Sequence, residues 1–415
     1  MNCLWIARDL PFPPDAGDKI YSANLATALA EAGAAVTFLG FPASDTSHLP
    51  PPDSPVRWRP VHGAKRGLRA ALLSHLPIAG AIHNTAAFRQ MLDSELQKPW
   101  DAIVFDNYGS GWALKHYLHS QRPAGKPTPV LVHVSHNQEG ALWHDMVSKS
   151  RANPLKKLAL WQNWLKVRAL ERFIMRHVDL STAISDEDAG ALAGIAGGQP
   201  ILLLPPGYSG ARQAERTIGA DCPKQVVLIG SFRWVVKQEN LRQFVDLADD
   251  VFHRHGIVFD VIGDVPESLL AELAPRLKAT RFHGFVPDFA PFFANARLAV
   301  VPEAIGGGFK LKFLDYIFGR LPVATIASAA AGLPAAIRSN LLCRTDLEAL
   351  VAAIVAHIDR LDTLNAMQQG AFDAAARLFH WRDRGSSLLD AIATCQQQRN
   401  GVPAKPTTDY RMKTI

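Results

Sequence analysis

Several residues that could bind a phosphate lie in one segment of the C-terminal half of the chain, directly after an apolar strand pattern. They are Glu303, Gly306, Gly307, Gly308, Lys310, Lys312 and Asp315. Glycines let the backbone approach an anion closely, and the free N–H groups at the start of the following helix supply donors and a positive dipole end. The lysines add charge, and a carboxylate about two turns into that helix can accept hydrogen bonds from ribose hydroxyls. The segment predicts a site for a phosphorylated, ribose-bearing ligand; a turn before a solvated helix is the alternative.

A second cationic segment, from Gly230 to Asn240, follows the first strand of the C-terminal half and contains Arg233 and Lys237. Side chains on a loop between a strand and a helix can neutralise a diphosphate, and an arginine can bind two phosphate oxygens at once. We expect both residues to stabilise a departing diphosphate. Side chains that merely face solvent are the alternative.

Polar and titratable residues also follow a strand in the N-terminal half, where His136, Asn137 and Glu139 come after the apolar run 130–134. In parallel α/β sheets the carboxyl ends of the strands carry the ligand site. His136 is therefore expected to orient a substrate hydroxyl or to transfer a proton near neutral pH. A structural histidine and a glutamate that caps the next segment are the alternatives.

The fourth candidate segment is the turn after the first strand, which contains Gly17, Asp18 and Lys19. The glycine allows a ligand to approach the backbone, and the two charged residues could meet an acceptor. A tight turn without a chemical role explains the same residues.

These segments need a scaffold that places strand ends side by side, and the apolar pattern predicts one. In the N-terminal half we expect strands at 3–7, 36–39, 102–105, 130–134 and 180–184, and helices at 20–32 and 154–178. In the C-terminal half we expect strands at 226–229, 258–262, 298–301 and 322–326, and helices at 240–253, 268–277 and 311–318. Alternating strands and helices form parallel, doubly wound sheets.

The prediction is thus an α/β protein with two Rossmann-like domains that face a cleft. Pro-Pro-Gly at 205–207 marks the linker, so the domains are expected at 1–205 and 206–375. A C-terminal helix at 376–396 is expected to pack back on the first domain, and 397–415 to form a flexible tail.

Composition narrows the class of protein. The net charge of +6 is too small to indicate nucleic-acid binding, but it suits phosphate-bearing ligands or an anionic membrane. The four cysteines lie far apart without metal-ligand spacing, and no apolar run reaches the ~18 residues that span a membrane. With no signal-peptide pattern at the start, we expect a cytoplasmic protein, either soluble or peripheral at the inner membrane face.

The four segments together resemble the group 1 retaining glycosyltransferases, a family with the GT-B fold. The similarity rests on Pro-Pro-Asp-Ala-Gly at 13–17, His-Asn-Gln-Glu at 136–139, Gly-Ser-Phe-Arg-Trp at 230–234 and the run 284–325. The last run resembles the family pattern most specifically, from Gly-Phe-Val-Pro-Asp through the three glycines to Pro-Val-Ala-Thr.

The resemblance implies that the second domain binds a nucleotide-sugar donor and the first an acceptor, in a pathway such as polysaccharide biosynthesis. Arg233 and Lys237 would hold the diphosphate, the glycines at 306–308 would lie beneath sugar and phosphates, and Asp315 would bind the ribose. His136 would lie close to the donor sugar. Transfer would retain the anomeric configuration and need neither cofactor nor metal, because protein cations stabilise the leaving group.

Three departures from the family pattern keep other functions open. The second of two glutamates usual in the family is Asp315 here, the first falls on Gly307, and Arg320 replaces a glycine. A catalytically degenerate binding or scaffold protein, or a sugar-nucleotide epimerase, would fit the same fold. A nicotinamide-dependent oxidoreductase is disfavoured because no G-x-G-x-x-G follows the first strand.

The acceptor is expected to be a glycan, a lipid-linked molecule or a small molecule. Basic residues lie beside leucines at 65–73, and more accompany the helical region 149–168. We hypothesise that these residues touch an anionic membrane that carries a lipid-linked acceptor. A solvated amphipathic helix docked on its own domain is the alternative.

Overall fold

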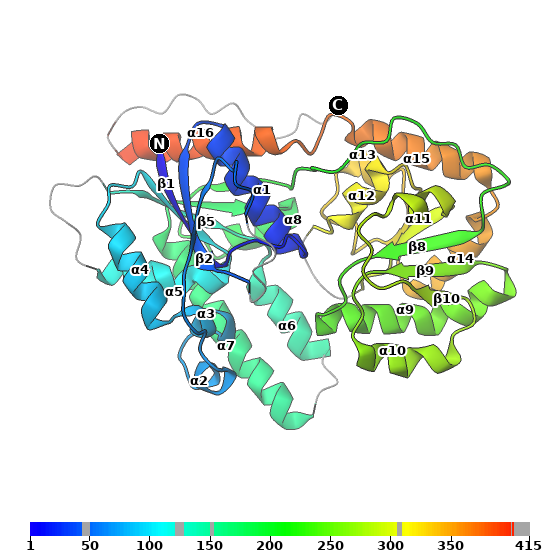
Figure 1. Cartoon of the computed structure of the whole chain (residues 1–415), viewed down its shortest axis with the longest axis horizontal. Coiled ribbons are helices and arrows are strands. Elements are labelled where there is room, and N and C mark those ends of the chain that lie inside the picture. Colours follow the sequence, from blue (N-terminus) through cyan, green and yellow to red (C-terminus); the bar gives the residue numbers. More distant parts are fainter. Residues whose placement is uncertain (44–49, 121–127, 150–152, 305–308, 400, 402–415) are drawn as a thin grey trace. The chain divides into compact units, whose positions relative to one another are not determined.

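The computed structural model describes residues 1–43, 50–120, 128–149, 153–304, 309–399 and 401. The chain forms two compact units: unit 1 comprises Met1–Pro205 and Trp381–Ile415, and unit 2 comprises Pro206–His380. Figure 1 shows the C-terminal helix, in red, beside the blue N-terminal elements of unit 1.

The chain returns to unit 1 after His380, later than the predicted residue 375. The reason is Phe379, which is buried in the core of unit 2 and whose carbonyl accepts a hydrogen bond from the backbone N–H of Tyr208 at 2.7 Å. These contacts keep the residues just before Trp381 in unit 2.

Unit 1 is built on a parallel seven-stranded sheet with the order β3-β2-β1-β4-β5-β6-β7. The strands are β1 (Asn2–Asp9), β2 (Ala35–Phe41), β3 (Arg57–Pro60), β4 (Ala102–Asp106), β5 (Val130–Val134), β6 (Leu180–Ala183) and β7 (Ile201–Leu203). Every residue of β4 and β5 is buried, as expected for central parallel strands covered on both faces.

Helices cover both faces of this sheet, because right-handed crossovers that leave β1 and β4 in opposite directions place their helices on opposite sides. The helices are α1 (Gly17–Glu31), α2 (Leu68–Leu72), α3 (Ile78–His83), α4 (Ala86–Leu96), α5 (Gly111–His119), α6 (Glu139–Lys149), α7 (Pro154–His177), α8 (Asp186–Ala193) and α16 (Trp381–Arg399). Local signals fix several ends: Gly33, at φ +108°, follows α1, and the Asn153 side chain accepts a hydrogen bond from Lys156 N at the start of α7.

Helix α16 packs directly on α1, as Figure 1 also shows. A Cβ atom added at Gly385 would lie 2.1 Å from the carbonyl oxygen of Ala28, so the crossing requires a glycine. The helix continues to Arg399, past the predicted end at 396, and residues 402–415 of the predicted tail lie outside the described residues.

Unit 2 is built on a parallel six-stranded sheet with the order β10-β9-β8-β11-β12-β13. The strands are β8 (Gln225–Ile229), β9 (Val258–Ile262), β10 (Thr280–Phe282), β11 (Leu298–Val301), β12 (Val323–Ile326) and β13 (Leu342–Arg344). The helices are α9 (Val235–Arg254), α10 (Glu267–Leu273), α11 (Ala290–Asn295), α12 (Lys312–Phe318), α13 (Ala335–Arg338), α14 (Leu347–His357) and α15 (Leu361–Ala375).

The two sheets share one topology. Each begins with a central strand, β1 or β8, continues to one edge, and then crosses back to add β4 or β11 on the other side of that first strand. In such sheets the ends of the two strands at the reversal leave a crevice in which ligands bind. The predicted fold class, two Rossmann-like doubly wound domains, is confirmed, and each unit contains one such switch point.

Across the described residues, no helix is both long and apolar enough to cross a membrane.

Candidate functional site

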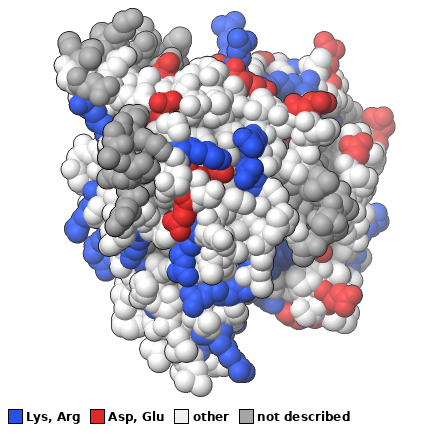
Figure 2. All heavy atoms as spheres, turned by 60° about the vertical axis from the view of Figure 1, so that its left-hand side comes forward, with Lys and Arg blue, Asp and Glu red and all other residues white. Residues whose placement is uncertain are grey.

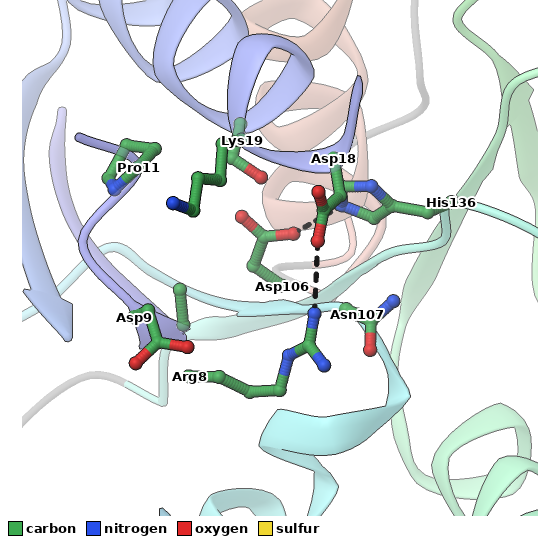
Figure 3. A pocket seen from close by; sticks show the side chains of 10 residues that line it. Arg8, Asp9, Pro11, Asp18, Lys19, Asp106, Asn107 and His136 are labelled. Atoms are coloured by element: carbon green, nitrogen blue, oxygen red, sulfur yellow. Dashed lines mark hydrogen bonds and ion pairs between the residues drawn. The ribbon is translucent and has the colours of Figure 1, made fainter. Parts of the chain in front are cut away.

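The switch point of unit 1 contains a small pocket of about 50 Å³, enough room for a few water molecules. Charged and polar side chains line it: Arg8 and Asp9 at the end of β1, Asp18 and Lys19 in the first turn of α1, Asp106 and Asn107 at the end of β4, and His136 after β5. Figure 3 shows Arg8, Asp18, Lys19, Asp106 and His136 gathered around this space. The predicted residues Asp18, Lys19 and His136 are thus brought together, and Gly17 begins α1 next to them.

The innermost part of the pocket is an ion pair between His136 and Asp106. The Nε2 atom of His136 lies 2.6 Å from Oδ1 of Asp106, and the Trp5 indole N–H donates to Oδ2 of the same carboxylate at 2.8 Å. Burial alone would lower the pKa of His136, but the adjacent Asp106 carboxylate raises it overall. Likewise, burial opposes ionisation of Asp106, yet the charge and hydrogen bond of His136 hold its pKa below the usual range. Both shifts favour the charged forms of the pair, and Asp106 fixes the orientation of the His136 ring.

The remaining charges of the pocket are also paired. Arg8 Nη2 lies 3.1 Å from Asp18 Oδ2, and Lys65 Nζ lies 2.5 Å from Asp9 Oδ1. Lys19 Nζ lies 2.8 Å from Asp15 Oδ1. Cations and carboxylates thus alternate around the pocket, which favours a polar ligand of low charge over a strongly charged one.

Behind the pocket, Asn107 connects β4 to two buried glutamates. Its backbone has a φ of +62°, a strained value for a residue other than glycine that is more frequent at functional sites. Its Nδ2 donates to Glu139 Oε1 at 3.3 Å, while Glu171 Oε1 accepts the Glu139 backbone N–H at 2.7 Å. Burial, followed for Glu139 by the charge of Glu171, raises the pKa of each glutamate to about 7. Glu139 and Asn137, which donates to Glu139 Oε1 at 3.5 Å, therefore lie behind the pocket and support it.

The switch point of unit 2 contains a different cluster, the lysine cluster, which consists of Lys237, Lys310 and Lys312 around Glu303. Lys312 Nζ lies 2.6 Å from Glu303 Oε1, and both side chains are buried. Burial would raise the pKa of Glu303, but the three lysines, Lys312 foremost, lower it to about 2. Three lysines thus act on the Glu303 carboxylate near the ends of β8 and β11, and Lys312 also acts on the Asp315 carboxyl.

Two glycines allow close packing beside the lysine cluster. Gly230 follows β8, and a Cβ atom at this position would lie 3.2 Å from Lys312 Nζ. Gly263, which follows β9 at φ +130°, packs so closely on Gly230 that a Cβ there would lie 1.7 Å from the Gly230 carbonyl oxygen. Glycine is therefore required at Gly263, where a side chain would clash with the Gly230 backbone, and Gly230 lets the Lys312 ammonium group approach β8.

Arg233, the second predicted diphosphate ligand, lies in an exposed ion pair. Its Nε contacts Oδ2 of Asp264, and its side chain is 71% exposed. The predicted Lys237, by contrast, is one of the main causes of the low pKa of Glu303. The structure therefore places half-buried Lys237 in the field of the Glu303–Lys312 pair and Arg233 on the surface.

Asp315, the predicted ribose ligand, lies one turn into α12. The hydroxyl group of Tyr208 forms a hydrogen bond with its carboxyl, yet burial raises the pKa of Asp315 to about 7. It is thus close to half protonated near neutral pH, and an additional hydrogen-bond donor would favour its ionised form. The predicted glycines Gly306, Gly307 and Gly308 lie outside the described residues.

Sequence reasoning missed five residues of these sites: Arg8, Asp9, Asp106, Asn107 and Tyr208. The first four end β1 and β4, so the rule that singled out His136 after β5 would have found them too. Tyr208 lies far from Asp315 in sequence and carries no local signal.

Two doubly wound parallel sheets, each with a polar switch point, are the architecture of the GT-B fold. Comparison with known families supports this class: a glycosyl transferase 4-like domain matches residues 17–207, and a group 1 glycosyl transferase domain matches residues 223–360. Together the two matches assign the chain to the glycosyltransferases.

Solved structures with this fold cover nearly the whole chain. WaaG, a glycosyltransferase involved in lipopolysaccharide biosynthesis, superposes with a TM-score of 0.65 at 16% identity, over 93% of this chain and 99% of WaaG. Anabaena HepE in complex with UDP and glucose gives 0.62 at 13% identity, over 95% and 99%. The trehalose 6-phosphate synthase of Burkholderia multivorans gives 0.58 at 13%, over 96% and 98%. No curated protein sequence matches the chain.

Proposed function

We propose that the protein transfers a sugar from a nucleotide-sugar donor to an acceptor hydroxyl with retention of the anomeric configuration. The observation that carries this proposal is the lysine cluster, where three lysines act on the buried Glu303 carboxylate at the switch point of unit 2. Positive charge at the carboxyl ends of parallel strands suits a pyrophosphate. HepE has been solved with UDP and glucose, so a UDP-sugar is the first donor to test.

The lysine cluster would act on the leaving group. When the bond from the anomeric carbon to the diphosphate oxygen breaks, the electron pair goes to that oxygen, and negative charge develops on the nucleoside diphosphate. Lys237 and Lys310 would neutralise this charge, while the ion pair with Glu303 holds Lys312 in position. Gly306 to Gly308 would support the phosphates with backbone N–H groups, Asp315 would bind the ribose, and Arg233 would contact the diphosphate from the surface. Under this proposal the reaction needs neither a metal ion nor a cofactor.

The unit 1 pocket would bind hydroxyl groups of the sugar and of the acceptor. Asp106 occupies Nε2 of the His136 imidazolium, so the N–H at Nδ1 is the one that can donate to a sugar hydroxyl. Asp18 and Lys19 would bind acceptor hydroxyls, and Asn107, supported by Glu139, would fix the shape of the pocket. The acceptor oxygen then attacks the face from which the diphosphate departs, and its proton passes to a departing phosphate oxygen.

We further propose a cytoplasmic enzyme that works at the inner membrane face, with a glycan, a lipid-linked molecule or a small molecule as acceptor. WaaG, whose fold this chain shares, is involved in lipopolysaccharide biosynthesis, which makes polysaccharide assembly the first pathway class to examine.

The test is incubation of the purified protein with UDP-, GDP- and TDP-sugars, with and without sugar acceptors. Release of nucleoside diphosphate and an NMR spectrum of the product with the donor's anomeric configuration are expected. An inverted product would contradict retention. Isomerised donor would indicate an epimerase, and tight binding without turnover a scaffold protein.

A further inference from the structure

Charge is distributed unevenly along the chain. Residues 61–83 and 146–170 contain nine Lys and Arg residues and no Asp or Glu. The whole chain has 44 Lys and Arg against 38 Asp and Glu, so the rest of it has 35 against 38 and is slightly acidic. The net positive charge of the protein is therefore concentrated in these two segments.

The fold brings the two segments together on unit 1. Lys166 Nζ in α7 donates a hydrogen bond to the carbonyl oxygen of Leu72 in α2 at 2.9 Å. Three residues earlier in α7, Asn163 Oδ1 accepts the backbone N–H of Ile78 at 2.8 Å. Helix α2 is thus fixed against the middle of α7, and both contribute to one surface.

Helix α7 has two apolar faces, of which one is not covered. Its buried residues, such as Val167, Leu170 and Ile174, pack on the unit 1 core. A second set, Leu155, Leu158, Trp161 and Leu165, recurs every three or four residues and so forms one stripe along the helix. Their exposed fractions are 80%, 60%, 46% and 37%. A helix on the surface of a soluble domain normally places polar residues there.

Helix α2 and its ends extend this exposed apolar area, since Leu68 is 58% and Leu73 is 91% exposed. We name the whole the basic-apolar surface. It consists of Leu68, Leu73, Leu155, Leu158, Trp161 and Leu165, together with the exposed cations Arg66, Arg69, Lys156, Lys157 and Arg168. In Figure 2 the lowest part of the molecule, where α2 and α7 lie in Figure 1, shows blue and white spheres and no red.

We propose that the basic-apolar surface docks unit 1 on an anionic membrane. Leucine and tryptophan side chains that stand out from a helix can enter the boundary between headgroups and acyl chains, while surrounding cations bind anionic headgroups. Both features occur together on this surface. The two segments contain no Asp or Glu that would repel anionic headgroups. A second copy of this chain fits less well, because two identical basic surfaces repel each other. The proposal deepens the location at the membrane face given under the proposed function, because it names the surface that binds, and it holds for a protein with or without transferase activity.

The experiment is flotation of the full-length protein with two kinds of vesicle, one of phosphatidylcholine alone and one that also contains about 30% phosphatidylglycerol. We expect the protein to float with the anionic vesicles and to be released by high salt, because each basic residue near the surface contributes about fivefold in partitioning. The double variant Leu155→Glu/Leu158→Glu should bind at least about tenfold more weakly. Since both side chains are exposed, circular dichroism and thermal unfolding should remain those of the wild type.

The control is Arg281→Glu/Arg338→Glu, which lowers the net charge more than the leucine variant does, but at exposed positions of unit 2. It should float as the wild type does. Equal flotation with neutral and anionic vesicles, or wild-type flotation of the leucine variant, would overturn the proposal. The proposal would also be overturned if the protein self-associated without lipid and the leucine variant abolished that self-association. Binding of UDP, followed in parallel by calorimetry, tests the proposed function separately.

Discussion

The two units share one sheet topology but place opposite chemistry at their switch points. In unit 1, Asp18 and Asp106 are each paired with a cation, Arg8 or His136, so the pocket is close to neutral. In unit 2, three lysines act on the carboxylate of Glu303 and lower its pKa. The fold supplies two equivalent crevices, and their side chains decide the ligand. A balanced pocket suits the hydroxyls of a sugar, whereas a group of cations suits a pyrophosphate.

The largest effect expected from this contrast is that of Lys312→Ala. Loss of a cation that stabilises a developing charge lowers kcat on the order of 10²–10³-fold. The effect should be at the upper end, because the variant also leaves Glu303 buried without its nearest cation. Steady-state assays of nucleoside diphosphate release measure it. Glu303→Gln, which keeps all three lysines, should lose less activity than Lys312→Ala. A larger loss in Glu303→Gln would contradict the contrast between the two switch points.

His136→Ala should lower kcat about 10²-fold, because the pocket loses the donor that orients the sugar. The positioning role of Asp106 is tested by Asp106→Asn. Without the carboxylate the pKa of His136 falls, since the neighbour that raises it is gone. The pH at which kcat/KM falls because the imidazolium loses its proton should therefore be lower in this variant. An unchanged pH profile of kcat/KM would show that the ion pair has no role in the reaction.

Lys237→Ala should reduce turnover more than Arg233→Ala, roughly 10²-fold against less than tenfold. Sequence reasoning predicts similar roles for the two residues. The structure separates them, because Lys237 acts on buried Glu303, whereas Arg233 is mostly exposed and paired with Asp264. Equal losses in both variants would show that Arg233 moves to the diphosphate when the donor binds.

The smallest effect concerns stability, not catalysis. The pKa of Glu139 is raised from 4.5 to about 7, so the folded protein holds a proton that the unfolded chain has released between these values. The free energy of unfolding should therefore fall as pH rises from about 4.5 to 7. Glu139→Gln removes this titration and should stabilise the protein at pH 8 by roughly 1–3 kcal/mol, with little change at pH 4.5. Urea unfolding at both pH values measures the difference, and a uniform shift would reject the buried charge as its cause.

The sequence predicted the centre of each sheet and missed its edges. All four edge strands, β3, β7, β10 and β13, escaped prediction. They have three or four residues, many of them half-exposed or polar, such as Arg57 and Arg281. Strands buried on both faces carry continuous apolar runs, whereas an edge strand keeps polar residues that limit pairing with other chains.

The site residues, like the strands, were predicted only in part. Residues in short motifs, such as His136 and Lys312, could be found because glycines or strand ends mark them. Their partners Asp106 and Glu303 required the fold: β4 and β5 must pair before Asp106 meets His136, and the chain must turn back before Glu303 meets Lys312. The larger catalytic effect expected of Lys237 than of Arg233 also depends on how far each side chain is buried, and the local sequence pattern does not indicate burial.

The central claim, that the lysine cluster of unit 2 holds a pyrophosphate, is tested most directly by calorimetric titration with UDP and with uridine. We expect UDP to bind at least about tenfold more tightly than uridine, and Lys237→Ala/Lys310→Ala to remove that preference while uridine binding persists. Equal affinity for the two ligands, or an unchanged preference in the variant, would contradict it.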